Sequence, residues 1–357
     1  MIFYDKIVNT LKSKNAFKSL ESLLKQREVY VIGKNEESKN VIKFLNVIGI
    51  IDDFSNALSW EGVPIIKSNK IDKNKWVVNC ATSIYPMSVR INLSQENISN
   101  IIDYYELAVD KRFPLPSFCL NTISDFENNF KQWSQLYETF EDIDSKKELE
   151  NILLFRLTAN PLYMKNYTVR LRDQYMEDFM EYSNEIMVDA GAFDGETSEI
   201  FCNKYPDYTR VHLFEPSEIN FKKVKSRMEN FRDMSYYNIG LSSSAGEVLF
   251  EDGLGLASKV SDKGNKKIII DKLDNIIDDG MTFLKMDIEG WEIPCIEGSI
   301  NNIKKYHPKL AVAVYHNPED FWKILQLIFS IRDDYDVYLR HYTEGWSETV
   351  MYFKPKK

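Results

Sequence analysis

The chain has 357 residues, which is enough for two ordinary domains or for one domain with a large extension. Hydrophobic residues make up 44% and aromatic residues 13%, so the chain can build substantial cores and is not of the disordered class. The net charge of -9 argues against a general nucleic-acid binder, because phosphate contacts need clustered lysine and arginine side chains.

Cysteine usage and hydropathy indicate the compartment. The four cysteines lie far apart, with no CxxC pair and no zinc-ligand spacing, so they are expected to be reduced thiols. The first residues lack the layout of a signal peptide, and no apolar run reaches the 18 or so residues that span a bilayer. We therefore expect a soluble, cytoplasmic protein without a transmembrane segment.

The first 113 residues predict a helix followed by a small α/β domain. Apolar residues at helical spacing predict a helix over residues 1–27. Short apolar runs then predict strands, and residues 38–46 between the first two predict a helix. This alternation indicates a small Rossmann-like domain over residues 28–113. Its predicted strands cover residues 29–32, 48–51, 62–65 and 76–80.

Residues 114–183 carry a different signal. Aromatic and aliphatic residues at steps of three and four predict helices over residues 127–140 and 146–157. Asn160-Pro161 then breaks the helical run. We interpret this region as a helical connector that packs against the two α/β segments rather than as a substrate-recognition element.

Residues 184–357 carry the stronger α/β pattern. Five apolar runs, each followed by polar residues, predict parallel strands, and two adjacent runs near the C-terminus predict an antiparallel pair. The expected fold is an α/β Rossmann-like sheet of the kind found in class I methyltransferases. The predicted strands cover residues 186–188, 211–214, 235–237, 282–286, 310–315, 336–339 and 349–353.

Polar residues gather where these predicted strands end. In an open parallel sheet, ligands bind beyond the carboxyl ends of the strands, so this concentration is the main functional signal. Lys285, Asp287 and Glu289 would fall on one face if their strand continued. The residues at the strand ends are Asp189, Gly191, Glu215, Asn238, Asp287, Glu289 and His316.

The first two of these strand ends predict a nucleotide-like ligand. Gly191 and Gly195 keep the first turn small, so that a ligand can approach the backbone and the N-terminus of the next helix. Glu215 lies 24 residues after Gly191, close to the spacing at which an acidic residue accepts hydrogen bonds from ribose hydroxyls in dinucleotide folds.

Four segments resemble the FkbM family of methyltransferases. They are Val188-Asp189-Ala190-Gly191-Ala192-Phe193-Asp194-Gly195, Phe214-Glu215-Pro216, Asn238-Ile239-Gly240-Leu241-Ser242 and Lys285-Met286-Asp287-Ile288-Glu289-Gly290-Trp291-Glu292. The resemblance covers residues 170–353, and the Asp-x-Glu-Gly-x-Glu motif is its most specific part.

The resemblance implies S-adenosylmethionine as methyl donor and O-methylation of a hydroxyl. The acceptor it implies is a small-molecule or nucleotide-linked sugar of bacterial surface polysaccharide or glycoconjugate biosynthesis. Asp287 and Glu289 would lie at the reacting centre. The residues that would hold the cofactor are Asp189, Gly191, Phe193, Gly195, Glu215, Asn238 and Asp287.

A hydroxyl is a poor nucleophile until its proton is removed, which calls for a base or a metal ion. His316 ends the strand expected beside that of Asp287, so we expect His316 to be the general base, oriented by a carboxylate. An alternative is that Asp287 and Glu289 hold Mg²⁺ with water ligands. A third interpretation is that His316 only caps its strand.

The N-terminal domain suggests competing functions. Gly33 is the only glycine kept from a G-x-G-x-x-G turn, and Asp52 lies 19 residues later. This domain could bind a nucleotide-sugar or a partner, or only support the fold. A NAD-dependent sugar-modifying oxidoreductase or epimerase is the first alternative function, and the degraded turn argues against it. The second is a non-catalytic binding or scaffold protein.

Overall fold

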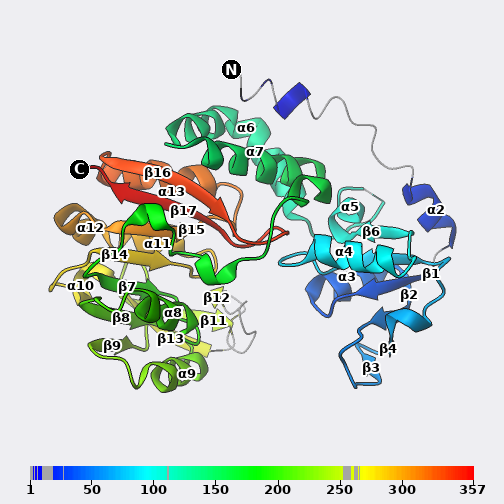
Figure 1. The fold of residues 1–357 in the computed structure, drawn as a ribbon, viewed down its shortest axis with the longest axis horizontal. Coiled ribbons are helices and arrows are strands. Elements are labelled where there is room, and N and C mark those ends of the chain that lie inside the picture. The colour runs from blue at the N-terminus through cyan, green and yellow to red at the C-terminus, as the bar shows by residue number, and fades with distance from the viewer. Residues whose placement is uncertain are drawn as a thin grey trace. The chain divides into compact units, whose positions relative to one another are not determined.

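The computed structural model describes residues 3, 5, 7–9, 19–26, 28–110, 112–251, 259–260, 264 and 266–357. The chain forms two compact units (Figure 1). Unit 1 comprises Met1–Tyr137, Lys147–Val169 and Tyr342–Ser347, and unit 2 comprises Glu138–Lys146, Arg170–His341 and Glu348–Lys357. Within the described ranges, no helix is long and apolar enough to cross a membrane.

Unit 1 contains a six-stranded sheet in the order β3-β4-β2-β1-β5-β6. All neighbours pair in parallel except β3 and β4. The central strands are nearly continuous apolar runs because helices cover a parallel sheet on both faces. The strands are β1 (Glu28–Ile32), β2 (Asn46–Ile51), β3 (Ser59–Trp60), β4 (Val63–Ile66), β5 (Trp76–Asn79) and β6 (Ile101–Asp103).

The helices of unit 1 confirm part of the sequence prediction. The helix predicted between the first two strands is α3 (Glu36–Phe44). The predicted N-terminal helix lies partly outside the described residues; within them, residues 3, 5 and 7–9 and α2 (Ser19–Gln26) are helical. Both helices predicted in the connector are present and begin earlier than predicted. The remaining helices are α4 (Pro86–Gln95), α5 (Tyr104–Ala108), α6 (Phe118–Thr139) and α7 (Ile143–Thr158), with 3₁₀ turns η1 (Ser68–Lys70) and η2 (Pro161–Met164).

Unit 2 contains a seven-stranded sheet in the order β16-β17-β15-β14-β7-β8-β9. Strands β9, β8, β7, β14 and β15 are parallel, and β17 is antiparallel to both of its neighbours. The predicted class I methyltransferase layout is therefore confirmed. The strands are β7 (Ile186–Ala190), β8 (Arg210–Phe214), β9 (Met234–Tyr237), β14 (Phe283–Met286), β15 (Lys309–Ala313), β16 (Tyr335–His341) and β17 (Thr349–Pro355).

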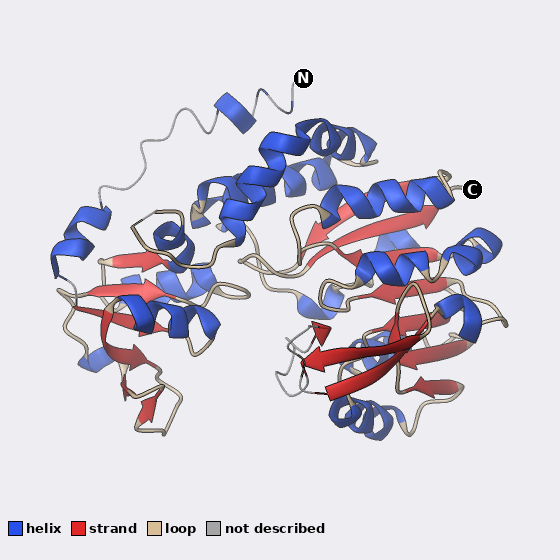
Figure 2. Ribbon diagram, turned by 180° about the vertical axis from the view of Figure 1, so that it is seen from behind, coloured by secondary structure: helices blue, strands red, loops and turns tan. Residues whose placement is uncertain are grey.

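Helices cover both faces of this sheet. Helix α8 (Glu196–Lys204) lies on the face toward the viewer in Figure 1, and α11 (Glu292–Glu297) and α13 (Asp320–Ile331) lie on the face seen in Figure 2. The other elements are α9 (Glu218–Met228), α10 (Leu273–Ile276), α12 (Ile300–Tyr306), η3 (Leu171–Asp173) and η4 (Asp178–Met180). Two covered faces explain why the central strands are apolar throughout.

A second, four-stranded sheet in unit 2 was not predicted from the sequence. Its order is β10-β13-β11-β12, and β10 pairs in parallel with β13 while the other pairs are antiparallel. From the sequence we also expect residues 248–272 to form a flap over the substrate, and part of this range lies outside the described residues. The strands are β10 (Gly240–Leu241), β11 (Gly246–Glu251), β12 (Lys259–Val260) and β13 (Lys266–Asp271).

Candidate active site

The turn after β7 requires glycine. Gly191 has a φ of +82°, and a Cβ there would lie 2.0 Å from the carbonyl oxygen of Asp287, so only glycine fits at this position. Phe193 and Gly195 also have positive φ values, of +51° and +86°, and α8 begins directly after Gly195. The turn therefore brings the carboxyl ends of β7 and β14 and the N-terminus of α8 to one edge of the sheet.

Glu215 connects this turn to the end of β8. Its side chain is buried, and its two carboxylate oxygens accept hydrogen bonds from the backbone N–H groups of Phe193 at 2.9 Å and Ser217 at 2.8 Å. Burial raises the pKa of Glu215 to about 7, against the two backbone donors, which lower it. Asn238, which follows β9, donates to the carbonyl oxygen of Glu215 at 2.8 Å. These predicted cofactor residues therefore lie together.

Asp189 lies beneath the turn and is fully buried. Its Oδ1 is 2.8 Å from Nζ of Lys285, and its Oδ2 accepts a hydrogen bond of 2.6 Å from Ser198. Lys285 also donates to the carbonyl oxygen of Gly191 at 2.7 Å. Burial lowers the pKa of Lys285, but Asp189 and Asp287 outweigh burial and raise it. The Asp189 side chain thus contacts the chain itself and supports the glycine turn from below.

The three predicted catalytic residues form one cluster. His316 Nε2 lies 3.3 Å from Glu289 Oε2 and 3.7 Å from Asp287 Oδ1. Asp287 Oδ2 also accepts a hydrogen bond of 2.7 Å from the hydroxyl of Tyr175. The strand β14 ends before Asp287, and Glu289 has a φ of +58°, so the alternation expected over Lys285, Asp287 and Glu289 was wrong beyond the strand end.

The environment of His316 favours a positive charge on its ring. Its Nδ1 lies 3.2 Å from Oε1 of Glu292, which is buried and accepts hydrogen bonds from the backbone N–H groups of Ile288 and Gly290. Burial lowers the pKa of His316, but Glu292, Glu289 and Asp287 together raise it well above its usual value. A histidine that already carries a proton cannot accept one from a hydroxyl, so this geometry favours a role other than general base.

Sequence reasoning missed several residues around this cluster. Glu348 accepts a hydrogen bond of 2.7 Å from Gln174, and burial together with Asp287 raises its pKa to about 7. The hydroxyl of Tyr315 lies 3.4 Å from Asp287 and 3.5 Å from Glu348. Glu292 stands inside the Asp-x-Glu-Gly-x-Glu motif and could have been found there, whereas nothing in the sequence marks Gln174 or Glu348.

The corresponding edge of the unit 1 sheet is closed by its own side chains. Asn35 caps α3 by accepting a hydrogen bond of 3.0 Å from the backbone N–H of Ser38, and Lys34 lies 2.6 Å from the carboxylate of Asp52. The helix N-terminus and the acidic residue are the two positions that bind pyrophosphate and ribose in dinucleotide folds. Both are already occupied by hydrogen bonds or ion pairs within the chain.

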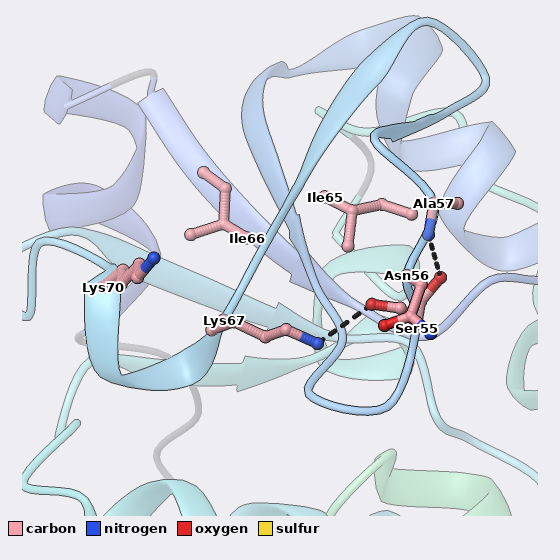
Figure 3. Close-up of a pocket in the computed structure, with 7 residues that line it drawn as sticks. All are labelled: Ser55, Asn56, Ala57, Ile65, Ile66, Lys67 and Lys70. Atoms are coloured by element: carbon pink, nitrogen blue, oxygen red, sulfur yellow. Dashed lines mark hydrogen bonds between the residues drawn. The ribbon is translucent and has the colours of Figure 1, made fainter.

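A pocket of about 400 Å³ lies beside this edge of unit 1 (Figure 3). Lys67 crosses it and donates to the backbone carbonyls of Asp53 at 2.7 Å, Ser55 at 2.9 Å and Asp52 at 3.3 Å. These bonds hold the loop after β2 and leave Lys67 no donor for an anionic ligand. The pocket is lined by Ser55, Asn56, Ala57, Ile65, Ile66, Lys67 and Lys70.

A known protein family matches the C-terminal part of the chain. The sequence model of the FkbM methyltransferase domain matches residues 189–343. This match spans the glycine turn, Glu215, Asn238 and the cluster of Asp287, Glu289 and His316. No curated protein matches the chain.

One solved structure shares the fold over almost the whole chain. A crystal structure of Methyltransferase FkbM from Methylobacillus flagellatus KT has a TM-score of 0.79 and 22% identity, over 98% of this chain and 99% of that chain. The fold of both units is therefore shared with that protein. A putative rRNA methylase from Clostridium thermocellum aligns with 50% of this chain and 90% of its own at 9% identity, with a TM-score of 0.35.

Proposed function

We propose that this protein, a methyltransferase with an FkbM domain over residues 189–343, uses S-adenosylmethionine to methylate a hydroxyl group. The observation that carries the proposal is the position of Glu215. Its carboxylate lies at the end of β8, and the backbone N–H groups of Phe193 and Ser217 orient both of its oxygens. Each oxygen keeps a lone pair that can accept a hydrogen bond from a ribose hydroxyl.

The residues present fit this cofactor. Gly191 and Gly195 open the turn to a ligand, and Glu215 offers the two acceptors that a ribose diol needs. Asn238 fixes the backbone of Glu215 through its amide, and Asp189 fixes Gly191 through Lys285, so both act on the site as positioning residues. When bound, S-adenosylmethionine supplies a methyl group on a positively charged sulfur.

The acceptor hydroxyl would meet the cluster of Asp287, Glu289 and His316. We assign the proton of the hydroxyl to a carboxylate of this cluster rather than to His316, because Glu292 and Glu289 hold the imidazole in its charged form. His316 then orients the two carboxylates. Removing the proton makes the hydroxyl oxygen a stronger nucleophile. Alignment of this oxygen with the methyl group supplies the rest of the rate enhancement.

We further propose that the acceptor is a sugar, either free, nucleotide-linked or part of a bacterial surface polysaccharide or glycoconjugate. The hydroxyls of Tyr175 and Tyr315 lie beside Asp287, and a cluster of carboxylates and hydroxyls pairs well with a polyol. The protein would work in the cytoplasm, where nucleotide-sugars and S-adenosylmethionine are made. The predicted Mg²⁺ ion stays a prediction.

The alternative functions have less support. A NAD-dependent oxidoreductase or epimerase would need the unit 1 edge, where Asn35 caps α3 and Lys34 pairs with Asp52. A scaffold protein would have no use for several carboxyl groups around a buried histidine, since burying ionisable groups costs free energy.

The test is a transfer assay with methyl-labelled S-adenosylmethionine and a panel of free and nucleotide-linked sugars. The proposal expects label in an O-methyl ether of a sugar. Label in a nitrogen- or carbon-linked methyl group would contradict O-methylation, and NADH formation without transfer would favour the oxidoreductase.

A further inference from the structure

We propose that Asp287, Glu289 and His316 bind a divalent transition-metal ion, such as Mn²⁺ or Zn²⁺, and that Glu292 holds His316 in place from behind. The binding site stands on geometry alone, and binding of the ion would displace the proton that the ring otherwise carries on Nε2. The role of the ion, which is to coordinate and orient the acceptor hydroxyl, rests on the proposed function.

The first argument is the position of the ligand atoms. One atom from each of Asp287, Glu289 and His316 lies within 4.8 Å of the other two. His316 Nε2 is 3.3 Å from the Glu289 oxygen and 3.7 Å from the Asp287 oxygen. An ion bonded at about 2.1 Å to two ligands at a right angle holds those atoms about 3 Å apart, so small side-chain shifts suffice.

The second argument is the hydrogen bonding of His316. Its side chain is only 9% exposed, and both ring nitrogens lie close to carboxylate oxygens. Neither nitrogen, however, makes a hydrogen bond of acceptable geometry with any part of the chain that the structure describes. Buried polar atoms are normally hydrogen-bonded, so an unpartnered Nε2 aimed between two carboxylates points to a ligand there.

The third argument is the group behind the ring. His316 Nδ1 faces Glu292 Oε1 at 3.2 Å, and two backbone N–H groups fix that oxygen. A carboxylate that faces the far nitrogen of a metal-binding histidine sets its tautomer and orientation, and a small rotation of the ring would give this contact hydrogen-bond geometry. Tyr175 fixes Asp287 in the same way through the 2.7 Å bond to its second oxygen. Two of the three proposed ligands, His316 and Asp287, are thus oriented by residues that do not themselves bind the ion.

The donor set indicates the class of ion. Two carboxylates and one imidazole mix hard oxygen and softer nitrogen ligands, which suits Mn²⁺, Fe²⁺ or Zn²⁺ better than Mg²⁺, an ion that prefers oxygen alone. The cluster also places three carboxyl groups around one imidazole, and a divalent ion would balance this excess of negative charge. The sequence-based expectation of Mg²⁺ on Asp287 and Glu289 lacked the histidine as a third ligand.

The test is a titration of the chelator-treated full-length protein with Mn²⁺, in which electron paramagnetic resonance measures the free ion. One saturable site per chain is expected. Glu289→Gln should abolish this site, and Glu292→Gln should keep the stoichiometry and weaken affinity about 10- to 100-fold. The matched control is His307→Ala, because His307 also lies 3.3 Å from a carboxylate, that of Asp334, away from the cluster.

Competition tests the class of ion. Zn²⁺ should displace Mn²⁺ at a far lower concentration than Mg²⁺ does, and equal displacement by Mg²⁺ would overturn the assignment. Absence of a saturable site, or a site that survives Glu289→Gln, would overturn the proposal itself. Circular dichroism and binding of S-adenosylmethionine confirm that each variant is folded. Binding of S-adenosylmethionine is measured separately from binding of Mn²⁺. A protein that binds S-adenosylmethionine but no Mn²⁺ would therefore contradict only this inference. A protein that binds Mn²⁺ but no S-adenosylmethionine would contradict only the proposed function.

Discussion

The ammonium group of Lys285 lies 2.8 Å from the carboxylate of Asp189, and both side chains are buried. This ion pair joins the neighbouring strands β14 and β7 directly beneath the glycine turn, where Lys285 also holds the carbonyl oxygen of Gly191. The pair therefore couples the stability of the sheet to the shape of the predicted cofactor site.

Removing one partner of this pair should be costly. Lys285→Met leaves Asp189 buried without its counter-charge, so the free energy of unfolding should fall by about 3–5 kcal/mol. Chemical denaturation measures the change. Lys222→Met is the matched control, because Lys222 and its partner Glu218 are exposed and solvent screens their pair. The double variant Asp189→Asn/Lys285→Met should lose less than the sum of the single losses, and additive losses would contradict direct pairing.

The glycine turn should not tolerate a side chain. Gly191→Ala places a Cβ 2.0 Å from the backbone oxygen of Asp287 and forces alanine to a φ of +82°. We expect a loss of stability above about 2 kcal/mol and a loss of cofactor affinity. Gly246→Ala is the matched control, since nothing lies within 4 Å of the added Cβ. Thermal unfolding and calorimetry measure both effects, and equal behaviour of the two variants would contradict the close approach of β7 and β14.

Cofactor binding should depend on pH through Glu215. Burial raises the pKa of this carboxyl to about 7, so it is protonated below that pH and ionised above it. Because the ionised carboxylate is the better acceptor for ribose hydroxyls, affinity for S-adenosylmethionine should rise as the pH increases from about 6 to 8. Below the pKa of Glu215, the affinity can change by at most about tenfold per pH unit.

Glu215→Gln separates this group from other titrating groups. The variant should bind the cofactor more weakly than the parent, and its affinity should change much less than that of the parent across this pH range. Calorimetric titrations at several pH values make the comparison. A parent protein whose affinity stays constant, or falls as the pH rises, would contradict the assignment of Glu215 to the ribose.

The cluster at the ends of β14 and β15 should serve turnover rather than cofactor binding. His316→Ala should leave the affinity for S-adenosylmethionine within about threefold and lower the methyl-transfer rate by about 10²-fold, because Asp287 and Glu289 lose the group that orients them. His307→Ala should change neither quantity, since His307 lies outside the cluster. Steady-state kinetics with an acceptor found in the transfer assay checks this, and full activity in His316→Ala would remove His316 from the reacting centre.

The sequence predicted the strand ends well because each apolar run stops at a polar residue. Glu215 was placed at the end of β8 in this way, because the apolar run of a buried strand ends where the strand ends, and the residue that follows lies at the edge of the sheet. His316 and Asp287 were expected to face one pocket on the same reasoning, and they lie 3.7 Å apart. Local patterns thus sufficed to predict which residues lie at the strand ends.

Pairings over long distances in the chain could not be predicted. Asp189 pairs with Lys285, and Tyr175 bonds to Asp287 from a segment more than 100 residues away. No periodicity marks such partners, because they depend on which strands become neighbours in the sheet. For the same reason, the sequence did not indicate that Glu292 and Glu289 together raise the pKa of His316.

The most direct test of the account is a calorimetric titration of the full-length protein with S-adenosylmethionine. We expect one site per chain, competition by the demethylated product, and affinity weakened about 10- to 150-fold by Glu215→Ala, the loss of hydrogen bonds to a charged group. Glu229→Ala, at an exposed glutamate after α9, should bind as the parent does. No binding by the folded parent, or unchanged affinity in Glu215→Ala, would contradict the proposed cofactor site.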